Sequence, residues 1–203
     1  LLIGPVGFYI RTQIDETPDF KKTAASTKVK TPLRDVLVKG HVSLLLAIGV
    51  VAGATAFNYV HKLYMPIYAL KQLNITATSS YLGALMTGVT LMLMAPVFGG
   101  LSDRYGRFRV LTIALLLTGF SSYPMFALLN AFPSFSTLLT VQAIVGLLIA
   151  ACLGPIPAML ADIFPTSIRG TGLALSYNFS VTLFGGFAPL IVTWMIDTSG
   201  SKL

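Results

Sequence analysis

The stretch that decides the fold class is Gly99-Gly100-Leu101-Ser102-Asp103-Arg104-Tyr105-Gly106-Arg107-Phe108-Arg109. It is a short charged turn between two apolar segments, at about residues 79–101 and 109–130. A membrane-spanning helix needs about 20 mostly apolar residues, and both segments satisfy this requirement. The pattern therefore predicts two antiparallel membrane spans joined by a tight charged turn.

The same alternation continues along the chain and predicts three more spans, at about residues 42–70, 137–162 and 170–196. The composition agrees, because 55% of the residues are hydrophobic and only 10% are charged. Soluble domains carry about 25% charged residues, so the excess apolar surface of this chain must face lipid. The predicted fold class is an all-α polytopic membrane helix bundle, with five spans in the region 42–196.

The remaining segments flank this bundle. Residues 1–10 are predicted to be the end of a transmembrane helix, residues 11–41 a polar connecting loop and residues 197–203 an outer loop. The break Gly154-Pro155-Ile156-Pro157 is the strongest interruption inside a span, because two prolines remove two backbone donors. Both a static kink and a hinge are consistent with it.

The basic residues predict the orientation of the bundle. Although the net charge is +7, these residues occur in short runs between apolar segments, which indicates membrane topology and no nucleic-acid partner. One set of connections holds Arg11, Lys21, Lys22, Lys28, Lys30, Arg34, Lys39, Arg104, Arg107, Arg109 and Arg169. The opposite set holds only Lys71, Lys202 and, at its margin, Lys62. The positive-inside rule places the first set in the cytoplasm.

Two motifs suggest more than topology. In the opening stretch, Gly99 and Gly100 allow close helix packing, Asp103 can cap a helix start, and Arg104 and Arg107 can reach neighbouring acidic groups. Such charges can latch one conformation, although a plain positive-inside turn is the alternative. The second motif is Ala161-Asp162-Ile163-Phe164-Pro165-Thr166-Ser167-Ile168-Arg169-Gly170-Thr171-Gly172.

The spacing Gly99-x-x-x-Asp103-Arg104-x-Gly106-Arg107 resembles a loop signature of the major facilitator superfamily, with Phe108 in place of a final basic residue. The second motif is similar to the turn between the tenth and eleventh helices of that superfamily. Tyr64-Met65-Pro66-x-Tyr68, and Tyr177-Asn178 with Phe184-Gly185-Gly186-x-x-Pro189, resemble its metabolite:proton symporter family, whose members carry citrate, 2-oxoglutarate, shikimate, proline or betaine.

This resemblance implies the C-terminal half of a two-half transporter, with residues 1–10 ending helix six, helices seven to eleven in 42–196, and helix twelve missing. The implied function is proton-coupled symport of a small organic anion, such as a di- or tricarboxylate, by alternating access. The implied partners are the small-molecule substrate, protons, the lipid bilayer of the plasma (inner) membrane and the N-terminal half. No cofactor and no metal are implied.

Polar residues inside the spans are the candidate substrate-binding residues, because such groups are costly in a membrane. On the first full span Thr55, Asn58 and Lys62 recur at helical spacing, next to His61. The ammonium group of Lys62 is expected to bind a substrate carboxylate, and the alternative is that the side chain extends to the outer membrane interface. His61 suits proton transfer or helix packing. The candidates on the last span are Tyr177, Asn178 and Thr182, for which interhelical hydrogen bonding is the alternative.

The candidate cytoplasmic gate consists of Gly99, Asp103, Arg104, Gly106, Arg107, Asp162 and Arg169. We expect its charges to stabilise the outward-facing state. The Asp103→Asn variant should then reduce transport and leave substrate binding largely intact, whereas an equal loss of both would contradict the gate.

Other functions are compatible with the same fold. A symporter of a zwitterionic osmolyte, such as betaine or proline, is the nearest alternative, and a channel is the alternative of another class. An enzyme is not expected, because the sequence has no HExxH, CxxC or G-x-S-x-G motif, and no carboxylates are paired for acid–base work. No catalytic residues are therefore assigned.

Overall fold

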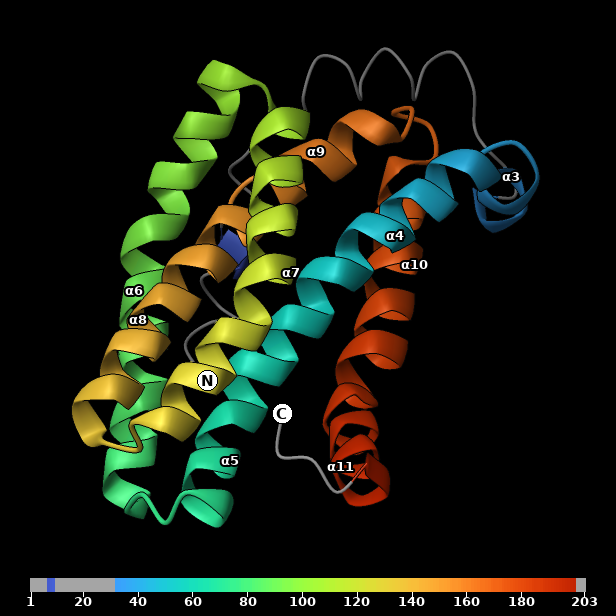
Figure 1. Cartoon of the computed structure of the whole chain (residues 1–203). Coiled ribbons are helices and arrows are strands. Elements are labelled where there is room, and N and C mark those ends of the chain that lie inside the picture. The colour runs from blue at the N-terminus through green and yellow to red at the C-terminus, as the bar shows by residue number, and fades with distance from the viewer. Residues whose placement is uncertain (1–6, 10–31, 200–203) are drawn as a thin grey trace.

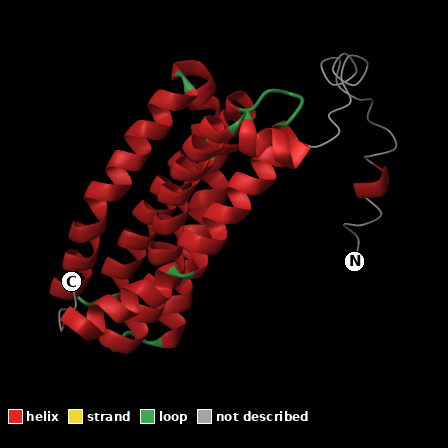
Figure 2. Ribbon diagram, turned by 90° about the vertical axis from the view of Figure 1, so that its right-hand side faces the viewer, coloured by secondary structure: helices red, strands yellow, loops and turns green. Residues whose placement is uncertain are grey.

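The computed structural model describes residues 7–9 and 32–199, and in these residues all regular secondary structure is helical (Figures 1 and 2). Five helices are long and apolar enough to cross a membrane, over His41–Gln72, Ala77–Tyr105, Arg107–Ala131, Phe135–Ile163 and Arg169–Thr198. They overlap the five predicted spans. The prediction of an all-α membrane helix bundle is confirmed.

Three of the long helices are divided into shorter elements. The elements are α3 Pro32–Val38, α4 His41–Asn58, the π-helix η1 Tyr59–Tyr64, α5 Met65–Gln72, α6 Ala77–Tyr105, α7 Arg107–Ala131, α8 Phe135–Leu153, α9 Ile156–Ile163, α10 Arg169–Ser180, the π-helix η2 Val181–Gly186 and α11 Ala188–Ser199. The predicted terminal helix at 1–10 and the predicted loop at 11–41 lie mostly outside the described residues, as does the end of the outer loop at 200–203. Within the predicted loop at 11–41, the described residues 32–38 form the helix α3.

The long helices run alternately up and down, so that the turn α6–α7, the turn α9–α10 and helix α3 lie at one end of the bundle (Figure 1). We call this the basic end, because these segments hold Arg34, Lys39, Arg104, Arg107, Arg109 and Arg169. The turns α5–α6 and α7–α8 lie at the opposite end. The alternation of charge along the sequence thus becomes a segregation of charge between the two ends.

Local chemistry explains where several helices begin. The hydroxyls of Thr76 and Ser134 accept hydrogen bonds from the backbone N–H groups of Ser79 and Thr137, so both residues act as N-caps. Between α6 and α7 the turn is a single residue, Gly106, with φ of 98°. A residue with a side chain rarely adopts this backbone conformation, so the tight turn requires glycine.

Close contact between α6 and α8 forms the centre of the bundle. A Cβ atom at Gly146 would lie 2.7 Å from the carbonyl oxygen of Thr87, and one at Gly154 would lie 2.8 Å from that of Ala95. The backbones of α6 and α8 are therefore in contact at two positions along the helices, Gly146 and Gly154. Small residues permit such close approach in membrane helix bundles. At Gly100, in contrast, an added Cβ atom would meet no described residue within 4 Å, so the described structure has no close helix contact there.

Each break inside the described spans lies close to a proline, whereas Pro96 and Pro124 lie inside the unbroken helices α6 and α7. The predicted interruption at Gly154–Pro157 is confirmed, since α8 ends at Leu153 and α9 begins at Ile156. The two π-helices η1 and η2 each end two or three residues before a proline, Pro66 or Pro189. Proline has no backbone N–H and its ring crowds the carbonyl four residues earlier, which disturbs the α-helical pattern in the preceding turn.

Candidate functional site

Arg107 is the centre of an ion-pair cluster at the basic end. Its guanidinium donates to the Asp103 carboxylate through Nε, at 3.0 Å, and contacts it through Nη2, at 2.9 Å. Nη1 donates to the Asp162 carboxylate at 2.6 Å and to the carbonyl of Ala158 at 3.3 Å. We call Asp103, Arg107 and Asp162 the charged cluster. It connects the α6–α7 turn to α9, although Arg107 and Asp162 lie 55 positions apart in the sequence.

The structure brings only part of the predicted gate into this cluster. The Arg104 guanidinium lies over the ring of Tyr105, 5.5 Å from its centroid, and the Nε atom of Arg169 donates to the carbonyl of Phe164. Neither residue forms an ion pair within the described part of the chain. Gly106 forms the turn, and the backbone of Gly99 lies against Gly154.

Asp103 has a different role from the one predicted for it. It lies in the last turn of α6, and Gly106 precedes α7 without a side-chain cap, so the prediction that Asp103 caps a helix start is wrong. The single-residue turn instead places Arg107 four positions later, on the same side, where the two charges pair. About two-thirds of each aspartate side chain is exposed, so these pairs contribute little to stability in water. Their chemistry suits a contact that forms and breaks.

Thr55, the first residue of the predicted polar stripe, lies where α4 crosses η2. A Cβ atom added at Gly185 would lie 3.0 Å from the methyl group of Thr55 and 2.8 Å from the ring of Tyr59. Thr55 is buried at this crossing, and the buried amide oxygen Oδ1 of Asn58 has no hydrogen-bond partner in the described structure. The crossing is therefore a close backbone approach, and Asn58 leaves an unused acceptor inside the bundle at the end of α4.

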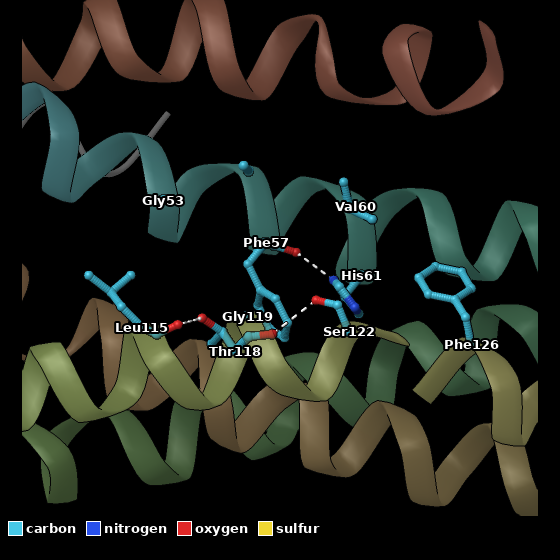
Figure 3. Close-up of a pocket in the computed structure, with 10 residues that line it drawn as sticks. Gly53, Phe57, Val60, His61, Leu115, Thr118, Gly119, Ser122 and Phe126 are labelled. Carbon is cyan, nitrogen blue, oxygen red and sulfur yellow. Dashed lines mark hydrogen bonds between the residues drawn. The ribbon is translucent and has the colours of Figure 1, made fainter. Parts of the chain in front are cut away.

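His61 lies in a pocket of about 450 Å³, which α4 and η1 line on one side and α7 on the other (Figure 3). Its ring stacks on Phe57, with centroids 4.0 Å apart, and packs against Phe126 at 5.4 Å. Nδ1 donates to the carbonyl of Phe57 at 3.2 Å, while Nε2 has no partner in the described structure. Figure 3 shows the ring beside Ser122. The aromatic contacts match the environment of a helix-packing histidine.

Lys62 lies in the same π-helical turn and is half-buried. It forms no salt bridge within the described residues. A cationic side chain inside a membrane-length helix is costly unless it meets water, a lipid headgroup or an anion.

The candidates on the last span are exposed. Tyr177, Asn178 and Thr182 all lie on the surface of the described structure, and the Asn178 amide donates to the carbonyl of Ala174 on its own helix, at 2.7 Å. Ser180, which was not predicted, joins this helix to α4 by donating to the carbonyl of Ile48 at 3.1 Å. The exposed face leaves the three candidates available to a ligand or to a further protein surface.

Sequence reasoning missed Gln142, which the structure identifies as the centre of a buried polar group. Its side chain is fully buried on α8 and joins α6 to η1 through Thr87 and the backbone of His61. The available signal was a glutamine in the middle of an otherwise apolar span, which is costly in a membrane without a partner. That signal alone did not show which helix holds the partner.

Comparison with known proteins gives consistent results. Residues 44–202 match the family model described as Major Facilitator Superfamily. The chain is 30% identical to the citrate-proton symporter of Klebsiella pneumoniae, over 100% of this chain and 45% of that protein. It is 30% identical to the ectoine/proline transporter ProP of Corynebacterium glutamicum, over 98% of this chain and 41% of that protein.

A third relative is the proline/betaine transporter of Escherichia coli (strain K12), which is 28% identical over 98% of this chain and 41% of its own length. The chain thus spans less than half the length of these curated relatives. No solved structure matches the chain significantly. The resemblance to metabolite:proton symporters is confirmed by these relatives.

Proposed function

Because the chain belongs to the Major Facilitator Superfamily, we propose that the full-length protein is a proton-coupled symporter of a small organic anion that works by alternating access. The chain is an integral membrane protein, and we place it in the plasma membrane. In the proposed arrangement, this part of the protein packs against an N-terminal half, and the substrate binds between them near the membrane midplane.

Lys62 is the observation that favours an anion. It is a half-buried cation in the long helix His41–Gln72 and lies in the wide turn η1, where the regular backbone pattern is interrupted. Wide π-helical turns occur frequently at functional sites. Lys62 has no anionic partner in the described structure, and a di- or tricarboxylate would provide one.

A zwitterionic osmolyte is the second candidate substrate, because two of the relatives reported above are named as transporters of proline with ectoine or betaine. Such a substrate also carries a carboxylate, so Lys62 could contact it. Its quaternary or secondary ammonium group would additionally need aromatic or acidic surroundings.

Uptake into liposomes separates these functions. The full-length protein is reconstituted, an inside-alkaline pH gradient is imposed, and uptake of labelled citrate, 2-oxoglutarate and betaine is measured in parallel. Gradient-dependent carboxylate uptake supports the anion proposal. Uptake of betaine alone replaces it with the osmolyte function, and uptake that does not saturate with substrate concentration contradicts a carrier.

We expect the Lys62→Ala variant to raise the KM for the carboxylate by about tenfold, because a charge-assisted hydrogen bond contributes roughly 1.5–3 kcal/mol. The matched control is Lys71→Ala, which removes the same charge from an exposed position near the end of α5. The measurement is the initial rate of uptake over a range of substrate concentrations. An unchanged KM in the Lys62→Ala variant would remove the anion argument.

A further inference from the structure

The backbone of η1 leaves one carbonyl group without its usual donor. The N–H of Met65 donates to the carbonyl of Val60, five residues earlier, as in a π-helix. The same pattern would pair the carbonyl of His61 with residue 66. That residue is Pro66, which has no N–H to donate. The carbonyl of His61 therefore needs a hydrogen-bond donor from outside its own helix.

Gln142 supplies this donor from the neighbouring helix α8. Its Nε2 atom lies 3.4 Å from the carbonyl oxygen of His61 and donates to it. Its Oε1 atom accepts a hydrogen bond from the hydroxyl of Thr87 on α6. The His61 carbonyl fixes the orientation of the amide, because a flipped amide would place its oxygen against this carbonyl, which can only accept. The Thr87 hydroxyl also lies 3.0 Å from the backbone carbonyl of Gln142, so it fits the amide in this orientation but does not select it.

The three groups are inaccessible to solvent. The side chains of Gln142 and Thr87 are fully buried, and His61 is 2% exposed. A buried carbonyl without a donor costs about 1–3 kcal/mol. Thr87 also lies against the close contact of α6 with Gly146, so this end of the network is held by packed backbone. The Gln142 amide thus connects a rigid helix pair to the irregular turn that carries Lys62.

We propose that Gln142 is a positioning residue, which holds the η1 turn open by satisfying the His61 carbonyl that Pro66 leaves unpaired, and so orients Lys62 toward the substrate. The orientation of Lys62 toward a substrate rests on the proposed function. The dependence of the turn on Gln142 does not, because it follows from the contacts of the described residues alone.

A double-mutant cycle in the full-length protein tests this link. Gln142→Leu removes the donor and is expected to raise the KM for substrate by about tenfold, with a smaller effect on the maximal rate. Pro66→Ala supplies a backbone N–H five residues after His61. In the Pro66→Ala background the same Gln142→Leu change should therefore raise the KM by less than about threefold. Ser176→Ala is the control, because Ser176 is buried but donates only to carbonyls of its own helix, those of Gly172 and Leu173.

A second readout needs no substrate. In a background without Cys152 and without any cysteine in the rest of the full-length protein, a single cysteine is introduced by Lys62→Cys, and its rate of reaction with a water-soluble maleimide is measured in membranes. Gln142→Leu should change this rate by about threefold or more when Pro66 is present, and have little effect in the Pro66→Ala background. Equal effects of Gln142→Leu in both backgrounds, or none in either, would overturn the proposal. If the parent protein transports none of the tested substrates, the proposed function fails while the labelling rates still decide the role of Gln142.

Discussion

Replacing Arg107 with glutamine is expected to reduce gradient-driven uptake on the order of tenfold. An effect of this size lies within the usual range of the coupling free energy between two distant sites of a protein. Among the described residues only Arg107 pairs with both aspartates of the charged cluster, so its loss removes the ionic link between the α6–α7 turn and α9 and leaves both carboxylates without their cation. The substrate affinity should change much less, because the cluster lies at the basic end, between the α6–α7 turn and α9, whereas Lys62 lies within the long helix His41–Gln72. Uptake rates and equilibrium binding to the purified protein are measured together.

Arg109→Gln provides the matched control. It removes the same charge from the same end of the bundle, but Arg109 is exposed and forms no ion pair in the described residues. Its uptake rate should stay close to that of the parent protein. If Arg107→Gln lowers binding and transport by the same factor, the cluster acts on the substrate site or on folding, and the gate hypothesis is contradicted.

Gly154→Ala is expected to destabilise the protein by about 1–3 kcal/mol, the usual cost of overpacking. The added Cβ atom would lie 2.8 Å from the carbonyl oxygen of Ala95 and 2.9 Å from the backbone nitrogen of Gly99. Because both are backbone atoms of α6, no side chain can move to relieve the contact. The helices must separate, which also disturbs the neighbouring charged cluster. The expected result is a lower melting temperature of the full-length protein in detergent.

Gly100→Ala is the control for this prediction. It adds the same methyl group to α6 one position after Gly99, but its Cβ atom would meet nothing within 4 Å. We expect its melting temperature to match the parent or to rise slightly, because alanine is the better helix former. A Gly154→Ala variant that melts at the same temperature as the Gly100→Ala variant would contradict the close contact of α6 with Gly154.

The sequence by itself was sufficient for the five spans, their alternating direction and the break before Pro157. Each of these follows from a local property. Hydrophobic length decides whether a segment can cross a membrane, the charge of a short connection follows its position in the chain, and proline removes a donor from its own helix. The tight turn at Gly106 belongs to this group, because only glycine readily adopts its backbone conformation.

The tertiary structure decided which residues meet. Hydropathy predicts that a segment is a membrane helix but does not set its rotation about its own axis, since lipid-facing and helix-facing positions are both apolar. The sequence therefore proposed five charged residues for the gate, and the structure pairs only Arg107 with Asp103 and Asp162. In the same way, both Gly99 and Gly100 were expected to allow close packing, and only Gly99 lies at the contact with α8.

Gln142 shows the physical reason most clearly. A buried polar group in a membrane must find its partner inside the protein, but that partner can come from any helix that packs beside it. Here it is the carbonyl of His61, 81 positions away, which lacks a backbone donor because residue 66 is proline. Pro66 removes a donor from its own helix, but Pro96 and Pro124 lie inside the unbroken helices α6 and α7, so a proline alone does not decide where a helix becomes irregular. The packing of α8 against η1 decided which side chain donates to the His61 carbonyl.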